Sequence, residues 1–129
     1  MWLKGYSCTH KAFIKALDAY SNKSKENASD VADMFRKALE TFFQEFFGGE
    51  RSLEKYVQDH TYEKYLDQCG VPTDVRSELK NTVEMYTKFI NNNAKHHDKT
   101  QENILEYIMY QTGNIIRFLI TLKKDESLS

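Results

Sequence analysis

The side chains best suited to chemistry in this chain are concentrated in residues 91–98, which read Asn-Asn-Asn-Ala-Lys-His-His-Asp. Three amides, one ammonium group, two imidazoles and one carboxylate stand together there, where two helical patterns meet. Imidazole changes its protonation state near neutral pH, and side-chain amides offer both hydrogen-bond donors and acceptors. This segment, which we call the polar junction, is therefore the candidate chemical site.

Lysines surround the polar junction, at Lys88, Lys95 and Lys99. Residues 71–99 carry five basic and four acidic side chains, whereas residues 28–70 carry five basic and nine acidic ones. The whole chain has a formal net charge of -1, so no global positive field indicates a nucleic-acid partner. A phosphate backbone can still be held locally by these lysines. The alternative is an ordinary solvated connection, because lysines near loops are common.

Apolar residues recur at helical spacing through most of the sequence and strict alternation is almost absent, which predicts an all-α fold. Glycines, the single proline and the run of asparagines provide the breaks between helices. We expect helices over residues 9–20, 27–47, 52–69 with a break near His60-Thr61, 73–90 and 100–123, followed by a polar tail.

These helices predict one domain spanning residues 1–129, with a core over about residues 9–122. The expected architecture is a four-helix up-and-down bundle with an additional short N-terminal helix, because the connections are short and no repeat period is present. Eight Phe and eight Tyr should fill the core, or alternatively supply part of an interface such as that of a symmetric dimer. Gly113 should cost its helix about 1 kcal/mol against alanine, a small loss if it permits a close helix contact.

Composition indicates the cellular location, the state of the cysteines and whether a metal is bound. No apolar stretch is long enough to cross a membrane and the first residues lack the apolar segment of a secretory signal, so we expect a cytoplasmic protein without a membrane partner. Cys8 and Cys69 are too few for a disulfide framework and should be free thiols. The four histidines lack metal-ligand spacing, and no Glu-x-x-His repeat is present. The sequence therefore predicts no metal and no cofactor.

Three motifs follow one another along the chain. HKAFIKALDAY forms a leading Ala-Leu helix, the segment from Arg36 to Glu40 reads Arg-Lys-Ala-Leu-Glu, and Asn92, Ala94 and His96 form Asn-x-Ala-x-His before a long apolar helix. In this order and spacing, over roughly residues 9–122, the motifs resemble the HEPN superfamily. More narrowly, the chain resembles the HEPN-like domains of bacterial abortive-infection and toxin systems.

The resemblance implies a four-helix core, a homodimer and, as in many members, a metal-independent RNA endonuclease built from an arginine and a histidine four to six residues apart. In such enzymes two copies of the pair share one cleft. In this chain His96 matches the histidine, and Asn91 stands where the arginine would be; no arginine occurs from residue 77 to residue 116. Asp98 replaces the tyrosine sometimes found two residues after the histidine. Asparagine also occurs at the first position within the family.

RNA cleavage without a metal requires a 2′-hydroxyl to be deprotonated, the leaving oxygen to be protonated and the negative phosphorane to be stabilised. We expect His96 to act as general acid or base, with His97 as its substitute, and Asn92 to orient the phosphate or the imidazole. Lys95 should offset the charge that an arginine would meet. The alternative for His96 is a structural hydrogen bond at the start of the last helix. The predicted site residues are His96, Asn92, Asn91 and His97 for catalysis and Lys95 and Lys99 for substrate binding.

Three functional hypotheses follow. The first is an RNA endonuclease acting as a homodimer; the second is a catalytically inactive HEPN-like module for dimerisation or for binding a nucleotide, RNA or protein. The third is a regulatory partner of a separate enzyme, such as a nucleotidyltransferase antitoxin. Outside the polar junction, Arg36 and Glu40 lie one turn apart and predict an intrahelical ion pair. The alternative turns Glu40 toward the core, where it would orient a site histidine.

Overall fold

The structure is a computed structural model that describes residues 5–22, 27–91 and 99–128. Within those ranges the chain is helical apart from turns and short connections, and no strand is present, which confirms the predicted all-α class. The six helices are α1 (Ser7–Ser21), α2 (Ala28–Phe47), α3 (Leu53–Gln58), α4 (Thr61–Gln68), α5 (Thr73–Asn91) and α6 (Lys99–Leu128).

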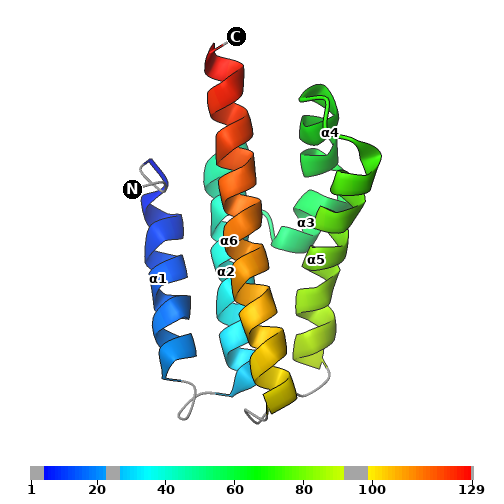
Figure 1. The fold of residues 1–129 in the computed structure, drawn as a ribbon. Coiled ribbons are helices and arrows are strands. Elements are labelled where there is room, and N and C mark those ends of the chain that lie inside the picture. Colours follow the sequence, from blue (N-terminus) through cyan, green and yellow to red (C-terminus); the bar gives the residue numbers. More distant parts are fainter. Residues whose placement is uncertain (1–4, 23–26, 92–98, 129) are drawn as a thin grey trace.

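The four long helices run side by side and alternate in direction (Figure 1). The end of α1, the start of α2, the end of α5 and the start of α6 all lie at the lower end of the molecule in this view. Helix α2 is central, since it contacts α1, α3, α5 and α6. The short helices α3 and α4 form the connection between α2 and α5 and both contact α5.

An apolar stripe along α2 organises the core. The spacing of these residues predicts one buried face, and the face is indeed closed to solvent. Burying each large side chain contributes about 1.5–3 kcal/mol. The buried members of the stripe are Val31, Phe35, Ala38, Leu39, Phe42 and Phe43, which pack with Leu105, Ile108, Ile116 and Leu119 of α6 and Tyr86 of α5.

Aromatic side chains fix the short helices against α2. The ring of Phe43 lies 5.7 Å from that of Tyr56 on α3 and 5.8 Å from that of Tyr62 on α4. The pair of Phe43 and Tyr56 is edge-on and that of Phe43 and Tyr62 is tilted, and such ring contacts add to the stabilisation from burial. The Tyr56 hydroxyl also donates a hydrogen bond of 2.8 Å to the carbonyl of Gly48, which ties the connection after α2 to α3. Most aromatics therefore fill the core, whereas Tyr107 and Tyr110 on α6 are exposed.

Helix α1 is fastened at its start by a carboxylate of α2. Glu45 Oε1 accepts hydrogen bonds from the backbone amide of Thr9 at 2.7 Å and from its hydroxyl at 2.6 Å. Its Oε2 accepts the amide of Cys8 at 3.3 Å. These amides have no partner within the helix, and a negative charge near them is favoured by the helix dipole. The cap explains why α1 begins at Ser7, two residues before the predicted start.

The predicted break in the third helix is confirmed, and it separates α3 from α4. His60 adopts a left-handed backbone conformation with φ 58° and ψ 23°, and it is the one non-glycine residue with positive φ in the described part of the chain. The prediction that the last helix ends at Lys123 is wrong, because α6 continues to Leu128. Residues 123–128 contain neither glycine nor proline, and lysine and glutamate are good helix formers, so nothing local ends the helix.

Three further findings bear on what was predicted from composition. Cys8 is exposed and Cys69 half-buried, and neither forms a disulfide, as predicted. Among the described residues no helix is long and apolar enough to span a bilayer, and no group of three His, Cys, Asp or Glu side chains is arranged to hold a metal ion.

Candidate functional site

Four of the six predicted site residues, Asn92, Lys95, His96 and His97, lie outside the described residues. The other two mark the ends of helices: α5 ends at Asn91 and α6 begins at Lys99. Their backbones are described and their side chains are not. The polar junction thus connects the two helices that the sequence predicted it to connect, and the contacts of its side chains stay predictions.

A buried polar contact holds together the two helices that flank the polar junction. The hydroxyls of Tyr86 on α5 and Thr112 on α6 are hydrogen-bonded, and both side chains are inaccessible to solvent. Because the Thr112 hydroxyl donates to the carbonyl of Ile108 at 2.7 Å, the phenol must be the donor in its bond to Thr112. Burial raises the pKa of Tyr86, and the hydrogen bond to Thr112 partly opposes that rise.

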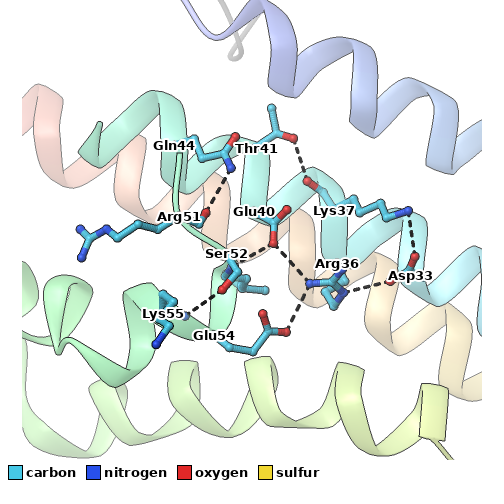
Figure 2. A network of polar contacts seen from close by, with 11 residues as sticks. Asp33, Arg36, Lys37, Glu40, Thr41, Gln44, Arg51, Ser52, Glu54 and Lys55 are labelled. Atoms are coloured by element: carbon cyan, nitrogen blue, oxygen red, sulfur yellow. Dashed lines mark hydrogen bonds and ion pairs between the residues drawn. The ribbon is translucent and has the colours of Figure 1, made fainter. Parts of the chain in front are cut away.

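Arg36 is the centre of a polar network between α2 and α3, which Figure 2 shows. Its Nε donates to Asp33 Oδ1 at 2.9 Å, and its Nη1 lies 3.4 Å from Glu40 Oε2 and 3.2 Å from Glu54 Oε1. The predicted ion pair between Arg36 and Glu40 is therefore confirmed, and it belongs to a larger set. Lys37 adds a contact of 3.2 Å to Asp33.

The ion pairs of the network favour the charged forms of Asp33 and Arg36. Although burial opposes charge on Asp33, hydrogen bonds from Arg36 and Lys37 keep the pKa of this carboxyl below its ordinary value. Burial likewise opposes the charge of Arg36, but the hydrogen bond and charge of Asp33, with the charges of Glu54 and Glu40, raise its pKa. The guanidinium of Arg36 is thus paired with carboxylates of the protein.

Glu40 makes a second interaction in addition to its ion pair with Arg36. Its Oε2 accepts a hydrogen bond of 2.9 Å from the backbone amide of Leu53, the first residue of α3 (Figure 2). The partners of Glu40 among the described residues are therefore Arg36 and Leu53. Its carboxylate caps the N-terminus of α3. Ser52 supports the same helix start by accepting the amide of Lys55 at 3.3 Å.

Beside this network, the structure has a groove between α3 and α5 with a volume of about 550 Å³. Glu54 belongs to both features, since it contacts Arg36 and lines the groove. Much of the surface of the wall is apolar, and four of the nine lining residues are lysine or glutamate. Apolar surface with a few polar groups is the usual composition of a small-ligand site. The lining residues are Glu54, Val57, Gln58, His60, Lys80, Val83, Glu84, Thr87 and Lys88.

Charged groups of α5 line the groove at regular spacing. Lys80, Glu84 and Lys88 follow one another every four residues, so they lie along one face of the helix. None of the three forms an ion pair with another described residue. The α5 wall contributes two positive groups against one negative group, and Glu54 adds from α3 a carboxylate that contacts Arg36.

Two residues at the start of α4 are unusual, and the first of them, His60, also lines the groove. His60 combines a disfavoured backbone conformation with a 3.1 Å contact between its Nδ1 and Glu63 Oε2. The Tyr62 hydroxyl is buried without a hydrogen-bond partner among the described residues. Burial, followed by the charges of Glu63 and of Glu84, raises the pKa of Tyr62. An unpaired buried hydroxyl is rare and costs stability.

The sequence predictions did not include the groove. The spacing of Lys80, Glu84 and Lys88 is visible in the sequence, but it is equally typical of any solvated helix face. Only the tertiary position of α3 opposite these residues turns the face into the wall of a groove. Comparison with family models, with curated proteins and with solved structures gave no match to this chain.

Proposed function

We propose that this chain is a HEPN-like domain of a prokaryotic defence or toxin system that acts in the cytoplasm as a homodimeric, metal-independent RNA endonuclease. In this proposal α2, the pair α3 and α4, α5, and α6 correspond to the four helices of the up-and-down core, and α1 is the additional N-terminal helix. The contacts of α2 with α3, α5 and α6, and of α3 and α4 with α5, support that correspondence.

The observation that carries the proposal is the position of the polar junction between α5 and α6. Helix α5 stops at Asn91 and α6 starts at Lys99, and the buried contact between Tyr86 and Thr112 keeps the two helices together. A histidine in the connection between two helices that contact each other can be repeated in a second copy, as a shared cleft requires.

The proposed chemistry assigns His96, or His97 in its place, to proton transfer. Asn91 and Asn92 orient the phosphate or the imidazole, and Lys95 and Lys99 offset the charge of the phosphorane. An amide in place of an arginine lacks the planar fork of charged donors. By analogy with a lost oxyanion donor, this substitution costs about 3 kcal/mol of transition-state stabilisation, roughly a hundredfold in rate.

The test is cleavage of labelled RNA by the purified protein in excess chelator, compared with His96→Ala. We expect the parent to cleave and His96→Ala to lose cleavage while keeping its helical content and its oligomeric state. The matched control is His10→Ala, which removes a histidine from α1, a helix that does not flank the polar junction. Equal cleavage by His96→Ala and the parent would overturn the proposal.

A second candidate function is a catalytically inactive HEPN-like module, alone or as the regulatory partner of a separate enzyme such as a nucleotidyltransferase. The absence of arginine from residue 77 to residue 116 favours it. The same experiment separates the two proposals, because an inactive module leaves the RNA intact, whereas turnover by metal-free parent protein excludes it.

A further inference from the structure

We propose that the groove between α3 and α5 holds one unpaired ribonucleotide of the RNA strand, with Lys80 and Lys88 contacting the phosphates on either side of it. This inference rests on the proposed RNA endonuclease function and adds a substrate subsite to it. It predicts that the protein prefers single-stranded RNA to a duplex and to DNA.

The size and the wall of the groove fit such an occupant. A volume of about 550 Å³ lies within the range of pockets for small ligands, about 300–1,000 Å³. Val57 and Val83 provide apolar surface for the faces of a base or a ribose ring. A base that remains paired in a helix cannot enter a groove of this size, whereas an unpaired base can be splayed out.

The two lysines have the charge for phosphates, and their flexible side chains can reach inward toward the two phosphates that flank one nucleotide. Lys80 and Lys88 are eight residues apart on one helix face, a distance of about 12 Å along the axis. Neither of them is paired with a carboxylate in the part of the chain that the structure describes. The carboxylate of Glu54 lies 3.2 Å from Arg36, a guanidinium that it shares with Asp33 and Glu40. Lysines that are not neutralised within the protein can release counterions from a bound strand.

Glu84 and Gln58 supply recognition of the nucleotide itself. Glu84 lies between the two lysines on α5, where its carboxylate can accept hydrogen bonds from ribose hydroxyls, a use of acidic residues known from dinucleotide sites. The 2′-hydroxyl is the group that distinguishes RNA from DNA. Gln58, on the α3 wall, offers an amide that can both donate to and accept from the edge of a base.

The groove is close to the polar junction along α5. Lys88 precedes Asn91, the last residue of that helix, by three residues, which is about 4.5 Å of helix rise. A nucleotide in contact with Lys88 would therefore extend its neighbouring phosphate toward the end of α5. This relationship makes the groove a subsite beside the bond to be cleaved.

Binding can be measured separately from cleavage. The full chain carrying His96→Ala is titrated, in chelator, into a fluorescently labelled single-stranded RNA oligonucleotide, and the anisotropy gives the Kd at several salt concentrations. The groove variant adds Lys80→Ala and Lys88→Ala; the matched control adds Lys11→Ala and Lys15→Ala, two exposed lysines of α1. Thermal unfolding of each protein confirms that the substitutions leave the fold intact.

Two lost phosphate contacts should lower the slope of log Kd against log salt by about 1.4, since each contact to a single strand contributes about 0.7. If the two proteins bind equally at 1 M salt, this difference in slope makes the Kd of the groove variant about 25-fold larger than that of the His96→Ala protein at 0.1 M salt. The control should keep the affinity and the slope of the His96→Ala protein. Glu84→Gln, made in the same background, should reduce the preference for RNA over DNA of the same sequence.

Equal affinity and equal slope for the groove variant and its control would overturn the inference, as would equal affinity of the His96→Ala protein for RNA and DNA. Failure of the proposed endonuclease has a different signature. In that case the parent does not cleave RNA, yet the groove variant still loses binding and the α1 control retains it.

Discussion

The carboxylate of Glu40 accepts a hydrogen bond from the backbone amide of Leu53 at 2.9 Å, so a side chain of α2 occupies the start of α3. Helix α3 has only six residues, too few to be stable by its own hydrogen bonds. It therefore depends on this cap and on the burial of Leu53 and Tyr56. Since α3 forms one wall of the groove, the contacts of the Arg36 network with α3 stabilise that wall of the proposed subsite.

Removing that cap should destabilise the protein. Glu40→Ala leaves the amide of Leu53 and the guanidinium of Arg36 each without one partner, which should lower the free energy of unfolding by about 1–3 kcal/mol. Urea denaturation measures the change. Glu54→Ala is the comparison, because Glu54 is more exposed and contributes an ion pair alone, worth about 1 kcal/mol or less. A larger loss in Glu54→Ala than in Glu40→Ala would contradict this assignment.

The cap of α1 by Glu45 gives a second prediction. Glu45→Ala removes the acceptor for the amides of Cys8 and Thr9 and should cost about 1–2 kcal/mol, as other helix caps do. Hydrogen exchange at those two amides should accelerate. Glu50→Ala, at an exposed position outside the helices, should leave both the exchange and the unfolding free energy unchanged. Unaltered protection in Glu45→Ala would rule out the capping role.

Two buried tyrosines should respond differently to loss of their hydroxyls. Tyr86→Phe removes a hydrogen bond to Thr112 and should cost about 1 kcal/mol. Tyr62→Phe removes a hydroxyl that has no partner in the described structure, so it should be neutral or slightly stabilising. Each variant is the control for the other in thermal or urea unfolding. A cost for Tyr62→Phe as large as that for Tyr86→Phe would mean that the Tyr62 hydroxyl is satisfied in solution.

The lowered pKa of Asp33 predicts a dependence of stability on acid. A carboxyl whose pKa is lower in the folded state than its ordinary value of 3.8 stabilises the fold above that pH, and the contribution is lost as pH falls through the folded-state pKa. Asp33→Asn should therefore be less stable than the parent at neutral pH, and the difference should shrink below pH 3.8. Urea unfolding at a series of pH values tests this. A difference that is the same at every pH would show that the charge of Asp33 is not involved.

Gly113 offers a stabilising substitution. The close helix contact that would justify a glycine is absent, because a Cβ atom at this position would meet the Phe13 ring at 3.6 Å, an ordinary contact distance. Gly113→Ala should therefore gain up to about 1 kcal/mol from helix propensity. A rise in Tm measures the gain. A lower Tm would show that the ring of Phe13 cannot accommodate the methyl group.

Hydrophobic spacing predicts the long helices well because it reports burial directly, as the stripe from Val31 to Phe43 illustrates. The break at His60 follows from the interruption of that spacing. Contacts such as Glu45 with Thr9, which are 36 residues apart, leave no periodic trace in the sequence, and they decide where α1 begins. The groove depends on where α3 lies against α5, which the spacing of charges on α5 alone does not determine.

At position 60 the residue best suited to the backbone conformation differs from the residue that is present. The backbone conformation there suits glycine, which has no side chain to strain it, yet an imidazole occupies it at the rim of the groove. Folding alone would favour the smaller residue. We therefore expect His60→Gly to raise the free energy of unfolding, because glycine relieves the backbone strain. The same change should weaken the binding of a ligand in the groove, because it removes the imidazole from the rim.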